Sequence, residues 1–326
     1  MKGFVGIDTS AYTTSVALVD QRGELVADKR EVLKVELGKR GLRQSEALFA
    51  HIKNLPFLFN EMNQYWATYS LAAVAVSDRP RNVAGSYMPV FRAGETVARS
   101  VASVLGIPLF TFSHQEGHIM AGERGSGVNL PERYIAVHFS GGTSEVLLVQ
   151  PGQSSYYDIS ILAATADLHA GQLVDRVGVK MGLPFPCGKF MEELAQELAP
   201  EKCGLRIPAA VKGDSFSFSG AEAQALRWVE QGVPLPEVSR AVFLCIANTL
   251  EKVIREKAKI VGVKDVLLVG GVMANFIIRN RLKERLSHPS LSCRLHFAPP
   301  GLSSDNAAGT AWLGWMKWLK TTGKEV

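Results

Sequence analysis

The chain has few cysteines and no long apolar run, and each absence excludes a class of protein. Its four cysteines, Cys187, Cys203, Cys245 and Cys293, are scattered through 326 residues without a Cys-x-x-Cys pair. This spacing disfavours a disulfide framework and a thiolate zinc site, and it predicts reduced thiols. No apolar stretch reaches the ~18 residues that cross a bilayer, and the first residues lack the apolar core of a signal peptide. We therefore expect a cytoplasmic protein with no membrane partner.

Common nucleotide-binding and protease motifs are missing as well. Residues 269–275, Val-Gly-Gly-Val-Met-Ala-Asn, follow a strand pattern and open a helix pattern, a frequent location for a bound base or ribose. They contain neither Gly-x-Gly-x-x-Gly nor a P-loop lysine, which disfavours Rossmann-type and Walker-type sites. Residues 114–118 read His-Gln-Glu-Gly-His and lack the glutamate position of HExxH and HxxEH, which disfavours a metalloprotease.

Length and composition fit a globular protein of two domains. At about 150 residues per domain, the chain corresponds to roughly two domains with sizeable cores. A composition of 47% hydrophobic and 21% charged residues is that of an average soluble protein and argues against disorder. The net charge of +5, with a pI near 9.0, is compatible with a nucleic-acid partner but does not by itself indicate one.

One hairpin pattern occurs twice, about half a chain apart. Apolar runs at 4–7 and 15–19 flank a hydroxyl-rich stretch, and runs at 134–139 and 146–149 flank a second polar turn. Helix and strand patterns alternate after each hairpin, so we expect an α/β fold of two duplicated mixed-sheet domains, residues 1–133 and 134–326. The patterns predict helices near 45–65 (kinked or broken at Pro56), 95–105, 171–181, 239–261, 274–286 and 305–319, and strands at 71–76, 107–112, 265–269 and 293–297.

Several polar segments are candidates for binding a nucleotide. Residues 140–143, Ser-Gly-Gly-Thr, form a candidate anion site, because backbone N–H groups and hydroxyls at a glycine turn can surround a phosphate. An ordinary hairpin turn would contain the same residues. Further along, Asp175 can accept hydrogen bonds from ribose hydroxyls, and Gly188 permits close approach of a ligand to the backbone. Residues 216–220, Phe-Ser-Phe-Ser-Gly, alternate like a short strand that ends at a helix.

Two histidines follow a strand pattern and a helix-capping pattern. Ser113 with Glu116 three residues later predicts a capping box, which places His114 and His118 at i and i+4 on one helix face. Asp305, after a Pro-Pro-Gly loop, would complete a two-His, one-carboxylate face suited to Fe or Zn with open positions for substrate. Two exposed histidines, and an aspartate that only caps a helix, are the alternatives.

Taken together, these segments resemble the TsaD/Gcp family, the tRNA threonylcarbamoyladenosine synthases formerly called O-sialoglycoprotein endopeptidases. The resemblance implies an actin-like, sugar-kinase-like ATPase fold with the nucleotide in the cleft between two domains and a metal beside its phosphates. It runs in order over nearly the whole chain, through residues 6–10, His114 and His118, residues 140–142, 170–175, 216–220 and 270–272, Asn275, and residues 305–306.

The resemblance implies a role for each candidate residue. His114, His118 and Asp305 would be ligands of one divalent metal, Fe or Zn. Asp8 and Ser10 would be the catalytic residues. The substrate phosphates would lie along His138, Phe139, Ser140, Gly141 and Gly142, and the nucleoside would be held by Asp175, Gly188 and Asn275.

The implied reaction is the transfer of a threonylcarbamoyl group from its adenylate to the N6 amine of the adenosine just after a tRNA anticodon. The chain would then be a metal-dependent acyltransferase that uses an ATP/AMP-type nucleotide or acyl-adenylate, with the metal stabilising negative charge as AMP leaves. The implied partners are tRNA and small proteins, including a paralogue of the same fold.

Four segments differ from the family pattern near the transferred group. Residues 9–13 replace Thr-Ser-Cys-Asp-Glu and lack its acidic pair, residues 78–82 replace Gly-Pro-Gly-Leu, residues 141–144 replace Gly-Gly-His-Thr, and Glu222 stands where the pattern has lysine. These differences leave an alternative open, a catalytically altered or inactive paralogue that binds nucleotide and assists or regulates a tRNA-modifying complex. The retained metal candidates favour the enzyme.

Overall fold

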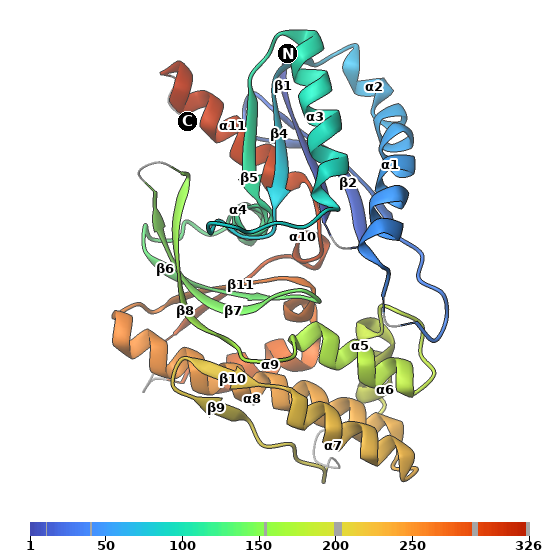
Figure 1. Ribbon diagram of the computed structural model, residues 1–326. Coiled ribbons are helices and arrows are strands. Elements are labelled where there is room, and N and C mark those ends of the chain that lie inside the picture. The colour runs from blue at the N-terminus through green and yellow to red at the C-terminus, as the bar shows by residue number, and fades with distance from the viewer. Residues whose placement is uncertain (11, 40, 153–154, 199–203, 289–292, 324–326) are drawn as a thin grey trace.

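The chain folds into two halves, each built around one mixed sheet, with the halves stacked one above the other (Figure 1). The structure, a computed structural model, describes residues 1–10, 12–39, 41–152, 155–198, 204–288 and 293–323. Cys203 and position 11 of the first hairpin lie outside the described residues. Cys187, Cys245 and Cys293 are buried free cysteines. No helix in these described ranges is both long and apolar enough to cross a membrane.

The first sheet contains β1 (Lys2–Ser10), β2 (Thr13–Asp20), β3 (Leu25–Val32), β4 (Ser70–Arg79) and β5 (Leu109–Ser113). Its order is β3-β2-β1-β4-β5. The first three strands form an antiparallel meander, and β4 and β5 continue the sheet in parallel from β1. The predicted hairpin is present, but its polar residues are not a loop: Asp8, Ser10 and Thr14 lie within the paired strands and are buried.

The second sheet repeats the plan of the first. It contains β6 (Tyr134–Phe139), β7 (Ser144–Pro151), β8 (Tyr157–Thr165), β9 (Ala210–Lys212), β10 (Ser215–Ser217), β11 (Asp265–Val269) and β12 (Arg294–Phe297). The part β8-β7-β6-β11-β12 has the same order and strand directions as β3-β2-β1-β4-β5, and β10 and β9 extend it beyond β8. The predicted duplication of a mixed-sheet unit is therefore confirmed, although β3, β8 and β9 were not predicted.

Helices cover both sheets and fill the space between them. They are α1 (Gln44–Glu61), α2 (Asn63–Trp66), α3 (Phe91–Leu105), α4 (His114–Ser126), α5 (Ala170–Lys180), α6 (Gly188–Gln196), α7 (Ser219–Glu230), α8 (Leu235–Val261), the 3₁₀ turn η2 (Gly271–Ala274), α9 (Phe276–Leu286), α10 (Pro300–Ser303) and α11 (Ala308–Thr322). Figure 1 shows α1 and α3 beside the upper sheet and α5 to α9 beneath the lower one.

The central strands are apolar on both faces because helices cover both faces. In β1, Val5 and Ile7 belong to the core cluster under α1 and α3, whereas Phe4 belongs to the cluster that includes α11. This alternation is the period-2 pattern of a strand buried on two sides. It explains why β1 reads as a continuous apolar run rather than as a half-polar one.

The structure differs from the prediction at Pro56 and at the start of the last helix. Helix α1 continues through Pro56 and does not break there. Proline has no N–H to donate to the carbonyl of Ile52, one turn earlier in the helix. Ile52 is exposed to water, so this carbonyl is not left buried without a donor. The last helix begins at Ala308, so Asp305 precedes it and lies in the connection from α10.

Helix α11 returns to the first half of the molecule. It packs on β1, β2 and β4, and both ends of the chain lie in the upper half in Figure 1. Helix α4 packs against α11 and contacts strands of both sheets, namely β4 and β5 above and β6, β11 and β12 below. The segments that carry the histidines and Asp305 therefore meet between the two halves. The division at residues 133 and 134 stays a proposal, with α11 crossing back over it.

Candidate active site

Helix α4 carries two of the candidate ligands, and a capping box closes its first turn. The Ser113 hydroxyl accepts a hydrogen bond from the Glu116 N–H at 3.2 Å, and the Glu116 carboxylate accepts one from the Ser113 N–H at 2.8 Å. This is the box that the sequence predicts. Because the box sets where the helix begins, it places His114 and His118 on the same face, one turn apart.

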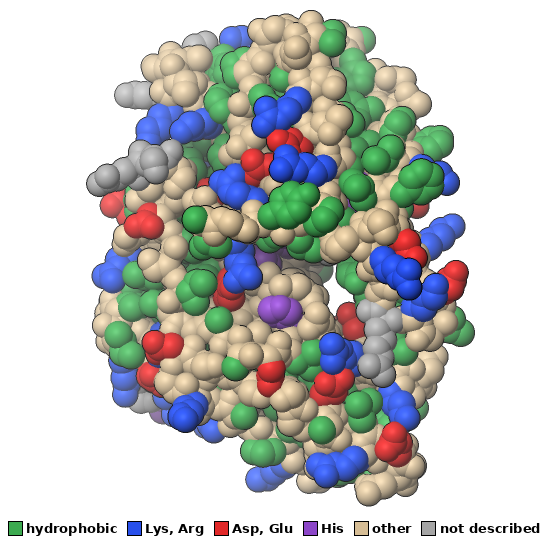
Figure 2. Space-filling view, viewed as in Figure 1, with side chains coloured by type: hydrophobic (Ala, Val, Ile, Leu, Met, Phe, Trp, Pro, Cys, Tyr) green, Lys and Arg blue, Asp and Glu red, His purple; other side chains and the backbone are tan. Residues whose placement is uncertain are grey.

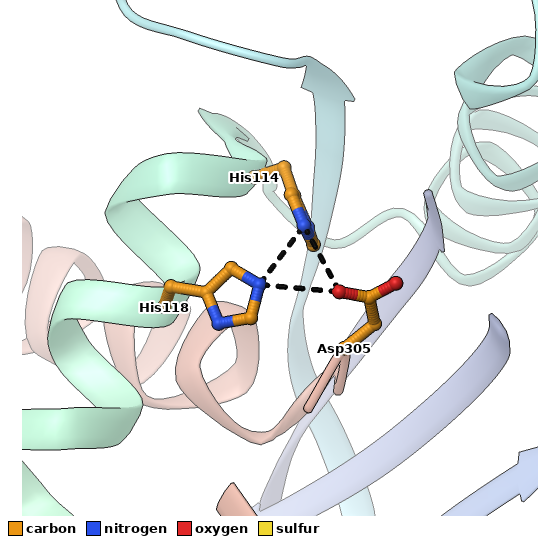
Figure 3. A group of neighbouring side chains, drawn as sticks. All are labelled: His114, His118 and Asp305. Carbon is orange, nitrogen blue, oxygen red and sulfur yellow. Dashed lines mark hydrogen bonds and ion pairs between the residues drawn. The ribbon is translucent and has the colours of Figure 1, made fainter. Parts of the chain in front are cut away.

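Asp305 reaches this face from near the other end of the chain. The Nε2 atoms of His114 and His118 are 3.0 Å apart, and Asp305 Oδ1 lies 3.5 Å from the first and 3.3 Å from the second (Figure 3). The three side chains that the sequence analysis grouped as ligands therefore point at a common centre. Their binding of a metal stays a prediction.

The separations of these three atoms fit a metal ion. An ion about 2.0–2.2 Å from each ligand, with ligand angles near 90–110°, separates its ligand atoms by about 2.9–3.5 Å, and the observed separations of 3.0, 3.3 and 3.5 Å lie in that range. Two imidazole nitrogens this close must have either a proton or a metal ion between them, because two bare lone pairs would repel each other. Two imidazoles and a carboxylate are a donor set that suits Zn or Fe.

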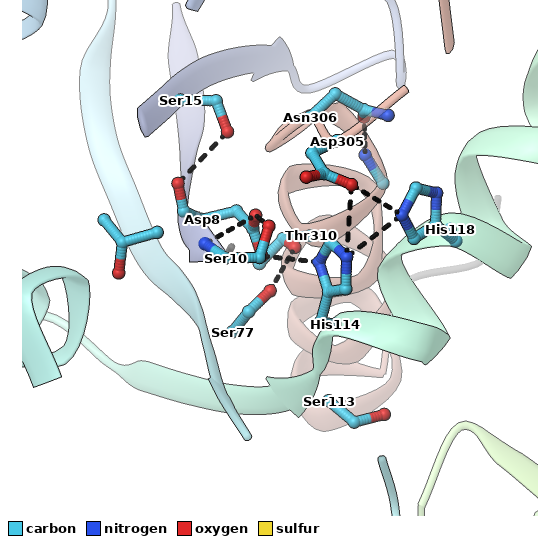
Figure 4. Close-up of polar contacts among 12 residues, drawn as sticks. Asp8, Ser10, Ser15, Ser77, Ser113, His114, His118, Asp305, Asn306 and Thr310 are labelled. Carbon is cyan, nitrogen blue, oxygen red and sulfur yellow. Dashed lines mark hydrogen bonds and ion pairs between the residues drawn. The ribbon is translucent and has the colours of Figure 1, made fainter. Parts of the chain in front are cut away.

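Asp8 holds the His114 ring from the side opposite the ligand cluster (Figure 4). Its Oδ1 lies 3.0 Å from His114 Nδ1, and since a carboxylate only accepts, Nδ1 is the donor. The Ser10 hydroxyl donates to Asp8 Oδ2 at 2.6 Å. This arrangement leaves His114 Nε2 to face His118 and Asp305. Asp8 and Ser10 thus contact each other and His114, and their predicted catalytic role stays a prediction.

The charges of this cluster depend on one another. Burial opposes charging of His114, but the carboxylates of Asp8 and Asp305 outweigh it and raise the pKa of His114 to about 10. Burial and the charge of His114 lower the pKa of His118. Burial raises the pKa of Asp8 and Asp305, but the neighbouring histidines outweigh burial and lower it overall. Of the two imidazoles, His114 therefore carries a positive charge, between the carboxylates of Asp8 and Asp305, and a bound metal would replace its proton.

His138 is a third imidazole beside the cluster. Its ring centre is 4.6 Å from that of His118 and 6.4 Å from that of His114. The ring is buried, and neither nitrogen has a hydrogen-bond partner in the described part of the chain. Burial and the neighbouring histidines lower its pKa well below the usual value, so the ring is neutral and has one N–H to donate. An unpaired buried donor of this kind fits the predicted contact with a substrate oxyanion.

The turn after β6 is preorganised and open on one side. The Ser140 hydroxyl accepts from the N–H groups of Gly142 and Thr143 at 3.3 and 3.1 Å. A Cβ added to Gly141 or Gly142 would meet nothing within 4 Å, so a ligand has room to approach the main chain there. Gly171 at the start of α5 donates from its N–H to the Ser140 carbonyl at 3.1 Å, which joins that helix end to the turn.

Phe139 is placed differently from the other predicted phosphate neighbours. Its ring is fully buried and packs against Phe216 and Phe218, with ring centres 5.6 and 6.3 Å away. The ring therefore belongs to the core of the second half. Only the main chain of Phe139 is left for the predicted substrate contact.

The candidate nucleoside residues lie at helix ends of the second half. Asp175 accepts from the Cys187 N–H at 2.8 Å, which brings its carboxylate beside Gly188, where an added Cβ would meet nothing within 4 Å. Burial outweighs that hydrogen bond and raises the pKa of Asp175 to about 6. Asn275 caps α9, with Oδ1 accepting from the Ile278 N–H at 3.0 Å, so its NH₂ group is the part that can serve a ligand. Nucleoside binding by these residues stays a prediction.

Two residues beside the cluster, Arg81 and Glu145, are not among the site residues predicted from the sequence. Glu145 lies directly opposite His138 in the β6–β7 pair, and Arg81 in the loop after β4 forms an ion pair with it. The register of the predicted hairpin would have revealed the first relation. No local signal reveals the second, because it joins the two halves of the molecule.

The cluster opens on the hollow between the halves. Figure 2 shows this hollow from the same side as Figure 1, with histidine side chains in and beside it. The side chains of His114 and Asp305 retain 14% and 20% of their exposure, whereas that of His118 retains 1%. A ligand in the hollow can therefore reach the cluster from the side of His114 and Asp305.

Comparison with known sequences gives one family over most of the chain. The family model described as TsaD, tRNA N6-adenosine threonylcarbamoyltransferase, matches residues 37–312. A tRNA N6-adenosine threonylcarbamoyltransferase of Methanopyrus kandleri is 30% identical over 317 residues, which cover 95% of this chain and 86% of the relative.

Comparison with solved structures gives the fold. HypF of T. kodakarensis superposes with a TM-score of 0.65 at 14% identity, over 98% of this chain and 48% of the HypF chain, so this chain spans about half of that protein. A ROK family glucokinase from Streptomyces griseus, in complex with glucose and AMPPNP, superposes with a TM-score of 0.53 at 10% identity, over 96% of this chain and 98% of the kinase. These similarities confirm the predicted actin-like, sugar-kinase-like fold.

Proposed function

The chain belongs to the TsaD family of tRNA N6-adenosine threonylcarbamoyltransferases, and from this premise we propose that it transfers a threonylcarbamoyl group from an acyl-adenylate to the N6 amine of an adenosine in tRNA. One observation supports this function above the others. His114, His118 and Asp305 converge beside a buried, unpaired His138 at the hollow between the halves. Such a cluster has no evident use in a protein that only binds partners.

We assign His114, His118 and Asp305 as the residues that would hold one divalent metal, Fe or Zn. When bound, the metal supplies a Lewis acid that stabilises negative charge on the phosphate of the departing AMP. Asp8 keeps His114 in the tautomer that ligates through Nε2, since Nδ1 donates to the carboxylate. We therefore interpret Asp8, supported by Ser10, as a positioning group for a metal ligand.

The remaining predicted residues would bind the donor. The open turn at 140–142 would offer the Gly141 N–H and space for the phosphate, and His138 would donate its N–H to an oxyanion beside the cluster. Asp175 would accept from ribose hydroxyls, with Gly188 and Asn275 completing the nucleoside contacts.

The fold would align the two reactants in the cleft. The N6 nitrogen attacks the carbonyl carbon of the threonylcarbamoyl group, the bond from that carbon to the phosphate oxygen breaks, and AMP leaves with the electron pair while N6 loses a proton. Holding the amine and the carbonyl together lowers the entropic part of the barrier. The proposed partners are tRNA and small proteins, including a paralogue of the same fold.

The function is tested by supplying the complete reaction. The metal-loaded chain is incubated with unmodified tRNA, threonine, bicarbonate, ATP, the enzyme that forms the acyl-adenylate and the paralogue, and the modified nucleoside is measured by mass spectrometry. We expect product with the unchanged chain and loss of product with His114→Ala and with Asp305→Ala.

A matched control separates loss of the site from general damage. His296 pairs with Asp265 at 2.9 Å in the second sheet, away from the cluster, so His296→Ala removes a His–Asp pair without touching it. This variant should retain activity. Absence of product from the unchanged, metal-loaded chain would reject the transferase and favour the catalytically altered paralogue.

A further inference from the structure

Arg81 crosses from the first half of the molecule to the second. It lies in the loop after β4 and forms an ion pair with Glu145 at the start of β7. The Glu145 side chain is 4% exposed, whereas that of Arg81 is 41% exposed. Within the described ranges, the contact from Nη1 to Glu145 is the one hydrogen bond that the Arg81 guanidinium makes. The rest of its planar set of N–H donors therefore has no acceptor in the described part of the chain and can bind a ligand.

The loop that carries Arg81 is fastened to the first turn of α4. The Gln115 N–H donates to the Pro80 carbonyl at 3.1 Å. The Gln115 side chain in turn donates to Glu145 Oε2 at 2.7 Å. Gln115, which follows His114 in α4, therefore helps to hold the carboxylate that accepts from Arg81. Three elements that carry the proposed site thus meet at Glu145, namely α4, the loop after β4 and β7.

Glu145 and His138 share one face of the second sheet. They are direct cross-strand partners in the antiparallel β6–β7 pair, and side chains of directly opposite residues project from the same face. Arg81, bound to Glu145, therefore lies beside the unpaired His138. Its charge contributes to the lowered pKa of both His138 and His169, although burial is the larger cause in each case.

We infer that Arg81 is a substrate-positioning residue that binds an oxyanion of the donor, with Glu145 and Gln115 holding its guanidinium in place. This inference rests on the proposed function. The donor carries two such groups, the carboxylate of its threonyl part and the phosphate of AMP. A guanidinium presents two parallel N–H donors to either group. Neither His138, which is neutral, nor the turn at 140–142 provides a full positive charge on this face.

The test measures binding of one probe for each oxyanion to the full, zinc-loaded chain. AMP carries the phosphate without the carboxylate, and N-carbamoyl-L-threonine carries the carboxylate without the phosphate. We expect Arg81→Gln to weaken one of the two probes by about 10- to 100-fold, the usual effect of removing a hydrogen bond to a charged group, and to leave the other within about twofold. The weakened probe identifies the group that Arg81 binds.

Two further variants separate ligand binding from a structural tie between the halves. Arg81→Gln alone leaves the buried Glu145 without its counter-charge, so the double variant Arg81→Gln/Glu145→Gln removes both charges. If Arg81 binds the ligand, the double variant stays as weak as the single one. Arg99→Gln removes an arginine of α3 that is 62% exposed and pairs with Glu95, and it should leave both affinities unchanged.

The outcomes distinguish this inference from the proposed function. Unchanged affinity for both probes in Arg81→Gln, or recovery in the double variant, would overturn the role of Arg81 and leave the transferase standing. Failure of the unchanged chain to bind either probe would reject the donor site as a whole, and Arg81 with it.

Discussion

Gly117 and Gly309 bring helices α4 and α11 together as closely as two backbones permit. A Cβ added to Gly309 would lie 1.8 Å from the Gly117 carbonyl oxygen, which no side chain can tolerate. His118 follows Gly117 on α4, and Asp305 lies just before the first turn of α11. The close approach of these two glycines therefore determines that the carboxylate reaches the histidines.

Gly309→Ala should destabilise the protein and separate Asp305 from the histidines. Because the new methyl group overlaps backbone, the helices must move apart, and we expect a loss of about 1–3 kcal/mol or more in the free energy of unfolding. Denaturant unfolding measures it. Gly220→Ala in α7, where an added Cβ meets nothing within 4 Å, should leave stability unchanged or raise it slightly. Equal stability of both variants would show that α4 and α11 are not in this contact.

Removal of either kind of ligand should abolish metal binding. His118→Ala and Asp305→Ala each leave two of the three donor atoms, which is too few for tight binding of Zn or Fe. Metal content after dialysis, measured by mass spectrometry, should be about one ion per unchanged chain and near zero in these variants. His296→Ala should keep its metal, and an unchanged chain without metal would remove the basis of the site.

Asp8→Asn should weaken metal binding, because Asp8 is not itself a predicted ligand but orients the ring of His114. The substitution keeps the size of the side chain but removes the charge that orients the ring, and loss of such a partner typically costs about 10- to 100-fold in metal affinity. Competition with a chelator measures the affinity. Asp158→Asn, at an exposed position of β8, should leave the metal affinity unchanged. An affinity of Asp8→Asn equal to that of the unchanged chain would mean that Asp8 does not orient His114 for the metal.

Adenosine binding should strengthen as pH rises through about 6. Burial raises the pKa of Asp175 to about 6, so its carboxyl is protonated below that pH and ionised above it, and only the carboxylate is a strong acceptor for ribose hydroxyls. Calorimetry between pH 5 and 8 measures the affinity. Asp175→Asn should flatten the profile, whereas Asp158→Asn, at an exposed position of β8, should not. A flat profile in the unchanged chain would exclude Asp175 from the nucleoside site.

A rise in pH should weaken the folded state through the Asp175 carboxyl, although it strengthens adenosine binding through the same group. Its pKa in the folded chain lies above the usual 3.8, so protonation favours folding. The contribution is complete below about pH 3.8 and is lost as the pH rises through about 6. Asp175→Asn should remove this loss, which thermal unfolding over pH 4–7 can detect. An identical pH dependence in both proteins would contradict the raised pKa.

Sequence patterns were sufficient for the features that depend on neighbours along the chain. The capping box of Ser113 and Glu116 and the spacing of His114 and His118 are set within two turns of one helix, so periodicity predicted them correctly. The two hairpins were predicted for the same reason. Strands β3 and β8 were missed because each is identified by the strand it pairs with more than by its own alternation.

Contacts between distant segments were decided by the tertiary structure. Asp305 meets the histidines because Gly117 and Gly309 let α4 and α11 touch. Helix α11 packs on the first sheet although it follows the second one in the chain. Arg81 of the first half forms an ion pair with Glu145 of the second. Each of these depends on a distance between packed elements, and no residue spacing along a chain encodes that distance. The sequence by itself determined which side chains are available for chemistry, and packing determined which of them meet.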